Sequence, residues 1–150
     1  MLAQKRRKLL TMAGVGAALG CGLVMGSQTA SFAEAPAVQA AKVTVTPSTG
    51  LGDGAKVQVA ASGFPANGQL TAGQCAEVQG KVACNGGNQQ KFSTDADGSG
   101  SAAMTVNLSF EGSYTDGSGS AGTVNCADVA CFIGVGDSSG QGVNAPITFA

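Results

Sequence analysis

Two pairs of closely spaced cysteines constrain the fold of this chain more than any other feature. Cys75 and Cys84 are nine positions apart, and Cys126 and Cys131 are five positions apart. An even set of cysteines in a small chain that carries an export signal indicates a disulfide framework. Four cysteines allow three pairings. We expect Cys75–Cys84 and Cys126–Cys131, because closing a short loop needs little prior folding, and each bridge would stabilise the fold by roughly 2–3 kcal/mol.

The alternative use of four cysteines is a zinc site made of four thiolates. Such sites usually hold the metal between Cys-x-x-Cys pairs, whose two sulfurs reach one ion from a single tight turn. Neither pair in this chain has that spacing. We therefore expect two disulfides and no metal.

The N-terminal segment, which contains the fifth cysteine, Cys21, has the three parts of a secretory signal peptide. Residues 5–8 form a basic start, and residues 9–26 form an apolar run without charge. Ser31 and Ala33 then supply small residues at the two positions that determine cleavage. This anatomy predicts export from the cell.

We predict that residues 1–33 are a secretory signal peptide, cleaved after Ala33, and that residues 34–150 are the secreted domain. Four alternatives remain open. Cleavage could follow Ala40, the apolar run could be a single-pass membrane anchor, the basic start could be a twin-arginine export signal, and the segment ending at Cys21 could be a lipobox.

The charge of the domain without its leader excludes two classes of partner. Four lysines remain against nine acidic residues, which gives a net charge of −5, and neither arginine nor histidine is left. Direct nucleic-acid binding needs clustered Lys and Arg to neutralise phosphates. Attachment to an anionic membrane surface needs a basic patch as well. We therefore expect no membrane partner for the mature form and no direct contact with DNA.

Short stretches of alternating apolar and polar residues predict strands rather than helices. Glycine interrupts nearly every stretch after residue 48, and turns rich in Gly, Asp and Asn separate the apolar stretches. The alternating stretches are residues 43–46, 56–60, 104–109, 133–136 and 147–149. This pattern predicts one all-β domain, an immunoglobulin-like, seven-stranded antiparallel Greek-key sandwich. The likeness to antibody domains is one of architecture, because the chain has no Trp to form their core.

Several ordered stretches of the mature chain resemble one known family. The stretches are residues 43–51, 73–76, 83–85, 94–98, 109–112, 122–126, 130–131 and 145–149. Together they resemble the neocarzinostatin family, the apoproteins of secreted actinobacterial enediyne chromoproteins. The resemblance covers essentially all of the mature chain and includes both cysteine loops.

The resemblance implies a seven-stranded sandwich with a deep cleft that holds a reactive enediyne chromophore non-covalently. In the family the protein stabilises and carries this chromophore, and the released chromophore cuts DNA. The implied partners are an apolar small-molecule chromophore and, only through it, DNA. We expect an antimicrobial, cytotoxic carrier that is a monomer and requires no cofactor beyond its cargo. The resemblance also implies the two local disulfides.

The resemblance places candidate cleft residues near the first cysteine loop, after the Ser-Phe-Glu-Gly stretch and after the last cysteine. These ligand-binding candidates are Glu77, Val82, Gln89, Ser113, Tyr114, Thr115, Phe132 and Gly136. Glu77 stands where the best-known member of the family has a bulky aromatic residue. We therefore expect a cleft that is less aromatic and more acidic than in that member.

The sequence contains few residues that could form a catalytic site, and we predict that the protein is not an enzyme and has no catalytic residues. Triads that depend on histidine are impossible because the chain has none. Asp95 and Asp97 are the nearest pair of acids that could cleave a glycosidic bond, but their Gly- and Ser-rich surroundings indicate a solvated turn. Glu111 is expected to be a charge at a strand edge. The Gly-rich residues 50–54 lack the Lys-Ser or Lys-Thr that follows a phosphate-binding loop.

The competing hypothesis is a secreted immunoglobulin-like binding module without an enediyne cargo, which binds another small molecule, a polymer or a protein. The acidic loops of the chain, which are rich in Ser and Gly, suit either function. An open apolar cleft would favour the carrier, and a filled cleft would favour the module.

Overall fold

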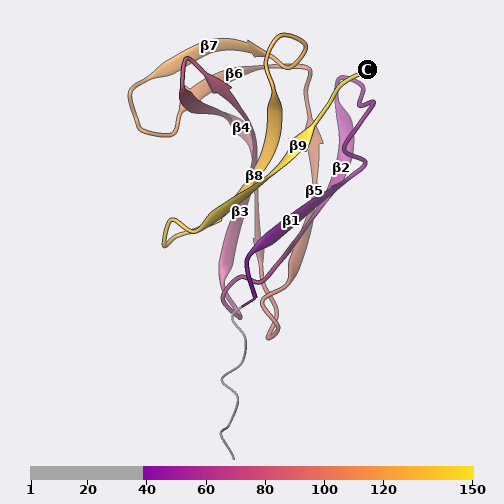
Figure 1. The fold of residues 1–150 in the computed structure, drawn as a ribbon, viewed down its shortest axis with the longest axis vertical. Helices are drawn as coiled ribbons and strands as arrows, with labels where there is room; N and C mark the ends of the chain where they lie inside the picture. Colours follow the sequence, from indigo (N-terminus) through magenta and orange to yellow (C-terminus); the bar gives the residue numbers. More distant parts are fainter. Residues whose placement is uncertain (1–38) are drawn as a thin grey trace, which may run out of the picture. The chain divides into compact units, whose positions relative to one another are not determined.

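The computed structural model describes residues 39–150, so the predicted signal peptide at residues 1–33 lies outside the described residues. All regular secondary structure in the described part is β-strand (Figure 1). The nine strands are β1 (Lys42–Thr46), β2 (Ala55–Ser62), β3 (Gln69–Val78), β4 (Lys81–Ser93), β5 (Gly100–Val106), β6 (Ser109–Tyr114), β7 (Ser120–Asn125), β8 (Cys131–Asp137) and β9 (Gly142–Ile147). Between residues 39 and 150 there is no helix with the length and apolar character needed to cross a membrane.

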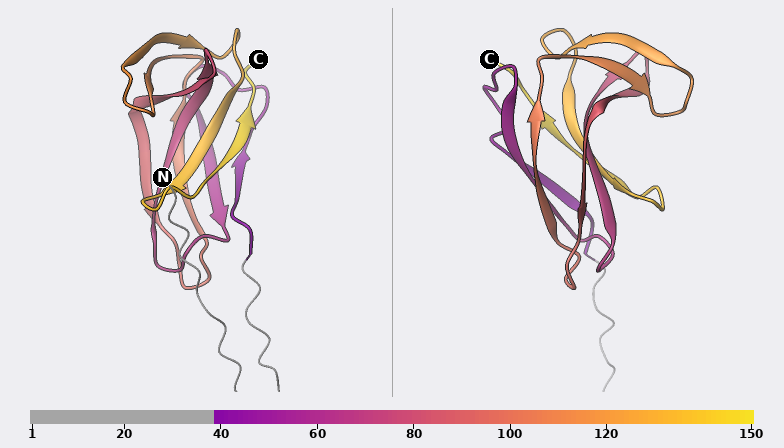
Figure 2. Two further views of the ribbon diagram at one scale, coloured as in Figure 1. Left: turned by 60° about the vertical axis from the view of Figure 1, so that its left-hand side comes forward. Right: turned by 180° about the vertical axis from the view of Figure 1, so that it is seen from behind.

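The strands form two sheets in which all neighbours are antiparallel. The smaller sheet has the order β1-β2-β5, and the larger has the order β7-β6-β4-β3-β8-β9. In Figure 1 and in the reverse view of Figure 2, β6 and β7 lean away from the smaller sheet. The all-β prediction is confirmed, but the described chain has nine strands rather than seven. The alternating stretches of the sequence leave out β3, β4 and β7, so alternation alone does not give the number of strands.

The core lies where the apolar faces of the two sheets meet, as the alternation predicts. In β2 the side chains of Val57 and Val59 are buried, while the alternate residues Lys56 and Gln58 are exposed. In β8 Ile133 is fully buried and belongs to the same apolar cluster. Period-two patterning therefore fixes which face of each strand points inward.

Both predicted disulfides are confirmed. Cys75 bonds to Cys84 across β3 and β4, and we call this the first disulfide. Cys126 bonds to Cys131 across the turn between β7 and β8, and we call this the second disulfide. Each bridge links cysteines that are close in sequence, so each closes a short loop of the unfolded chain.

The strand predicted to run through Leu108 ends earlier, because a buried side chain takes over the backbone hydrogen bonds. β5 stops at Val106. The side-chain Nε2 of Gln74 donates to the Asn107 carbonyl at 2.6 Å, and its Oε1 accepts from the Asn107 N–H at 2.9 Å. The next N–H, of Leu108, donates to the Asp53 carboxylate at 2.8 Å. Side chains thus replace the β-ladder at this turn.

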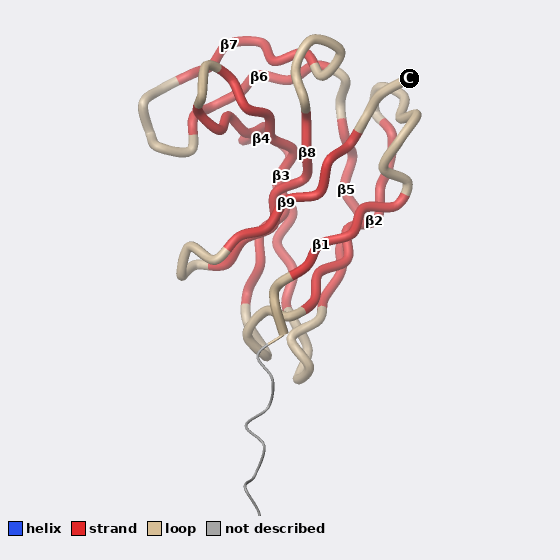
Figure 3. Tube along the Cα trace, viewed as in Figure 1, coloured by secondary structure: helices blue, strands red, loops and turns tan. Residues whose placement is uncertain are grey.

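The pairing of β4 with β3 is interrupted by a bulge, and β4 follows a bent course in Figure 3. Gln89 pairs with Gly73, but Cys84 already pairs with Cys75. Residues 85–88 therefore have no partner on β3. Bulges of this kind bend a strand and change the direction of its side chains. Here the change decides which residues of β4 face the candidate site.

Candidate functional site

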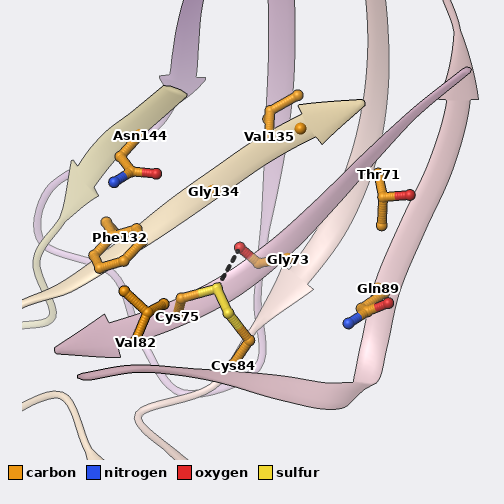
Figure 4. A pocket seen from close by; sticks show the side chains of 11 residues that line it. Thr71, Gly73, Cys75, Val82, Cys84, Gln89, Phe132, Gly134, Val135 and Asn144 are labelled. Atoms are coloured by element: carbon orange, nitrogen blue, oxygen red, sulfur yellow. Dashed lines mark hydrogen bonds between the residues drawn. A yellow bond between two sulfur atoms is a disulfide. The ribbon is translucent and has the colours of Figure 1, made fainter. Parts of the chain in front are cut away.

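The floor of a cavity is formed by β3 and β8, which are neighbours within the larger sheet (Figure 4). One face of these strands carries Leu70, Ala72 and Ile133, which are buried in the core. The opposite face carries three cross-strand pairs, all of which line the cavity: Thr71–Gly136, Gly73–Gly134 and Cys75–Phe132. The core face stabilises the sheet, and the other face is left to form the site.

The walls of the cavity come from β4 and β9. Val82, Cys84 and Gln89 of β4 and Asn144 of β9 all line it. In a regular strand, positions 84 and 89 would face opposite sides because they differ by an odd number. The bulge at residues 85–88 brings both to the same cavity. In the view of Figure 4, Phe132, Val82 and the first disulfide gather at one end, while Thr71 and Gln89 lie toward the other.

The cavity is open to solvent, small and without charge. Its volume is about 230 Å³, and its lining residues include one aromatic side chain, Phe132, and no charged side chain. Pockets for drug-sized ligands begin at roughly 300 Å³. The cavity therefore fits one ring system of a ligand rather than a whole large molecule. A second hollow of about 260 Å³, lined by Lys56, Asn88 and Gln90 among others, is the more polar of the two.

Four of the eight predicted ligand-binding residues line the cavity: Val82, Gln89, Phe132 and Gly136. Glu77 is exposed and does not line it, although it is the direct cross-strand neighbour of Val82. Direct neighbours share a face of the sheet, so Glu77 lies beyond the apolar end of the cavity. The lining is therefore not acidic, in contrast to our expectation from the sequence.

The other three predicted residues lie where β6 meets β4, outside the cavity lining. Ser113 pairs with Cys84 and so shares its face of the sheet. The N–H of Thr115 donates to the carbonyl of Val82 at 3.0 Å. Tyr114 pairs with the buried Ala83, which places its ring on the opposite face.

A polar clasp holds the β6–β7 turn to the β3–β4 turn beside the cavity. The Nζ of Lys81 lies 3.0 Å from the Asp116 carboxylate, 3.1 Å from the Ser118 hydroxyl and 5.4 Å from the centre of the Tyr114 ring. Hydrogen bonds from the hydroxyl and the N–H of Ser118, together with Lys81, lower the pKa of Asp116 from 3.8 to about 2. The Asp116 carboxylate is therefore ionised throughout the neutral pH range.

The turn between β8 and β9, which follows the lining residue Gly136, is held by a second carboxylate. Asp137 accepts hydrogen bonds from the hydroxyl of Ser139 at 2.6 Å and from the N–H of Gln141 at 3.0 Å. The hydrogen bond from the Ser139 hydroxyl is the main cause that lowers the pKa of Asp137. Both turns next to the cavity are thus fixed by side chains.

Seven lining residues are absent from the predicted ligand-binding set, and two of them, Thr71 and Asn144, carry polar side chains. Thr71 is one step along β3 from the buried Leu70, and Asn144 is one step along β9 from the buried Ala145. The alternation of each strand could have placed them on the outer face. The pairing of β8 with β9, which the sequence alone does not give, was also needed to bring Asn144 opposite Gly134.

The acids considered for catalysis occupy structural positions. One carboxylate oxygen of Asp95 accepts the N–H groups of Asp97 and Ser99, both at 2.9 Å, so this pair forms a turn. Glu111 is exposed on β6 and accepts a hydrogen bond from the Thr123 hydroxyl at 2.6 Å across the sheet. Among residues 39–150 no three or more His, Cys, Asp or Glu side chains are grouped as metal ligands.

The fold and the cavity together define a small disulfide-bonded β-sandwich with an uncharged, mainly apolar cleft. The sequence profile of the neocarzinostatin family matches residues 43–149. The chain is 38% identical over 136 residues to the antitumor antibiotic C-1027 apoprotein of Streptomyces globisporus, a match that covers 91% of this chain and 90% of that protein. It is 36% identical over 148 residues to macromomycin of Streptomyces macromomyceticus, covering 98% and 99% of the two chains.

A solved structure of macromomycin agrees with this fold at a TM-score of 0.69 and 41% sequence identity, covering 74% of this chain and 100% of the other. The chain belongs to the neocarzinostatin family.

Proposed function

We propose that this protein is a secreted apoprotein that binds, stabilises and carries a reactive enediyne-type antibiotic chromophore without a covalent bond. The observation that carries the proposal is the open, uncharged cavity with Phe132, Val82 and the first disulfide at one end. Membership of the family supports it, since one relative is named as the apoprotein of an antitumor antibiotic. An open apolar cleft also favours the carrier over a binding module without cargo.

The lining suggests a division of roles among its side chains. Phe132, Val82 and the sulfurs of the first disulfide would bury an apolar ring, at roughly 25 cal/mol for each Å² removed from water. The Thr71 hydroxyl and the amides of Gln89 and Asn144 would orient the ring through hydrogen bonds.

Residues outside the small cavity would contact the rest of a larger ligand. Glu77, Ser113 and Thr115 lie next to Val82 or Cys84 and are exposed, so a ligand that extends beyond the apolar end would reach them. The carboxylate of Glu77 would favour an amino group over an anionic group at this place. Tyr114 would act through Lys81 rather than by direct contact.

We propose further that the protein is a monomer and not an enzyme, and that any damage to DNA comes from the released chromophore. The net charge of −5 at residues 34–150 disfavours a direct complex with DNA. A gel-shift assay at physiological salt should detect no complex between DNA and the cargo-free protein. A tight complex would show that the partner is misassigned.

Export is proposed from the basic start and apolar run of residues 1–33. N-terminal sequencing of protein recovered from the culture medium should give a first residue near Glu34. Recovery of a product that still begins at Met1 would contradict the predicted cleavage.

Mass spectrometry tests the carrier function itself. Protein purified gently from its producer should show, under non-denaturing conditions, a mass above that of the polypeptide. Extraction with organic solvent should release this additional mass as a chromophore and leave the polypeptide mass alone. A native mass equal to that of the bare polypeptide in every preparation would favour the module without cargo.

A further inference from the structure

The second hollow, of about 260 Å³, lies where β5, an outer strand of the smaller sheet, approaches β4 of the larger sheet. Its lining residues come from β2, β4 and β5 and are Lys56, Asn88, Gln90, Ala103, Met104 and Thr105. None of them lines the first cavity. β4 contributes to both sites, because consecutive residues of a strand face opposite sides: Gln89 lines the first cavity and Gln90 lines the second hollow.

The second hollow is formed at the place where β4 and β5 separate into different sheets. Near the turn that joins them the two strands are in close contact, since a Cβ atom added at Gly100 would lie 2.5 Å from the Ser93 carbonyl oxygen. Further along, a side chain makes the connection: Nδ2 of Asn88 donates to the carbonyl of Thr105. Within the described residues β5 pairs with β2 alone, so no strand closes the space beside it. Asn88 therefore fixes the two walls of the hollow relative to each other.

Lys56 is the only charged residue in this lining, and its charge is not compensated by the protein. Its side chain is exposed, and the one ion pair among residues 39–150 joins Lys81 to Asp116. The strands β1, β2, β4 and β5 contain no Asp or Glu at all. In a domain with a net charge of −5, this acid-free surface is a local exception. A positive group without a partner at the mouth of a hollow favours an anionic ligand.

The other lining residues suit a ligand that also carries hydroxyl groups. The carboxamide groups of Asn88 and Gln90 and the hydroxyl of Thr105 can each donate and accept hydrogen bonds. Ala103 and Met104 add a small apolar area that could contact the C–H groups of a ring. The volume of about 260 Å³ lies below the roughly 300 Å³ at which pockets for drug-sized ligands begin, so a single sugar-sized unit fits.

We propose that the second hollow binds a carboxylate that carries several hydroxyl groups, namely a sugar acid, either free or as the end of an acidic polysaccharide. The carboxylate would pair with the ammonium group of Lys56, and the hydroxyl groups would bond to Asn88, Gln90 and Thr105. The proposed site goes beyond the carrier function and does not depend on it, because the two hollows share no lining residue.

The test is a titration of the mature protein, with both disulfides intact, by D-galacturonate, followed through amide NMR signals. The signals of Asn88, Gln90 and Thr105 should shift and saturate. D-galactose, which lacks the carboxylate, and acetate, which lacks the hydroxyl groups, should each bind about fivefold more weakly or worse. Trigalacturonate distinguishes the two sources of the ligand: tighter binding than the monomer indicates a polysaccharide end, and weaker binding indicates the free acid.

Lys56→Met should weaken galacturonate binding about fivefold or more and remove its dependence on salt concentration. Lys42→Met is the matched control, because Lys42 is exposed on β1 of the same sheet but lies outside the hollow, so this variant should bind like the wild type. Gln90→Glu is a second variant of nearly unchanged size. Its added carboxylate should weaken the binding of galacturonate and not that of galactose.

Several results would refute the proposed site. Shifts that do not saturate, or equal affinities for galactose and galacturonate, would show that no carboxylate is recognised. Acetate that binds as tightly as galacturonate would remove the role of the hydroxyl groups. Equal losses in Lys56→Met and Lys42→Met would show only a general attraction to lysine. All these outcomes are independent of the search for a bound chromophore by mass spectrometry, so a failure of this site and a failure of the carrier function can be told apart.

Discussion

Replacing Gln74 by leucine should lower the free energy of unfolding by about 2–3 kcal/mol, although the two side chains are similar in size. Gln74 is fully buried, and its amide makes two hydrogen bonds to the backbone of Asn107, at 2.6 and 2.9 Å. A buried polar group without a partner costs about 1–3 kcal/mol. Gln74→Leu would leave two such groups, the N–H and the carbonyl of Asn107. Asn107 is half-buried, so water recovers part of this cost. Burial of the leucine side chain offsets roughly another 1 kcal/mol.

Equilibrium unfolding in urea with both disulfides intact measures this effect. Gln69→Leu is the control, because Gln69 lies on the same strand and bonds only to the exposed Ser93 hydroxyl. Exposed substitutions usually change stability by no more than about 0.5 kcal/mol. Equal unfolding midpoints for the two variants would refute the claim that Gln74 holds β3 to the turn after β5.

Gln74→Glu distinguishes the donor from the acceptor of this contact. The introduced carboxyl group could still accept from the Asn107 N–H, but when ionised it could not donate to the Asn107 carbonyl. Burial would raise its pKa in the folded state above the unfolded value of about 4.3. The folded state of the Gln74→Glu variant is therefore favoured at low pH, and the variant loses stability as the pH rises through the raised pKa of the carboxyl group. Gln74→Glu should lie closer in stability to the wild type at pH 4 than at pH 7.

Three further changes test the surroundings of the cavity. Removing the first disulfide as Cys75→Ala/Cys84→Ala should cost roughly 2–3 kcal/mol of stability and should also weaken the binding of a neutral aromatic fluorophore such as N-phenyl-1-naphthylamine. Removing the second disulfide should cost a similar amount of stability and leave the affinity for this fluorophore unchanged; equal effects on its binding would contradict a role for the first disulfide in the site. Because the pKa of Asp116 is lowered to about 2, the stabilising contribution of its ion pair with Lys81 is present above pH 3.8 and is lost as the pH falls toward 2. Dissociation of the fluorophore should therefore become faster over that pH interval in the wild type but not in Asp116→Asn. Glu77→Trp should shift preference from ligands with an amino group toward flat neutral ones, and a titration that shows equal affinities of both versions for such a neutral ligand would remove Glu77 from the site.

The strands and the disulfides were accessible from the sequence because both depend on local patterns. Alternation in β2 and β8 predicts which side chains are buried, and the burial of Val59 and Ile133 follows it. Cysteine spacing predicts which partners can close a short loop, and both bridges agree. These signals need no knowledge of which strand lies beside which.

The cavity could be predicted only in part, because it depends on register between strands. Gln89 and Cys84 face the same cavity only through the bulge in β4, which breaks the alternation that a sequence analysis assumes. Tyr114 lies on the opposite face because it pairs with Ala83, and a shift of one residue would have reversed this. Thr71 and Asn144 reach the cavity through the pairings of β8 with its two neighbours.

The division of β3 and β8 into two faces explains how a small domain can hold a cavity at all. On the inner face, Leu70 and Ile133 pack in the core and Gln74 bonds to the turn after β5, so the position of β3 is fixed without help from its outer face. The outer face is then free to carry glycines that weaken a sheet, and the first disulfide ties β3 to the bulged β4 at the same place. Stability is supplied from one side of the strands and ligand shape from the other. Changes on the inner face should therefore alter unfolding, and changes on the floor should alter binding.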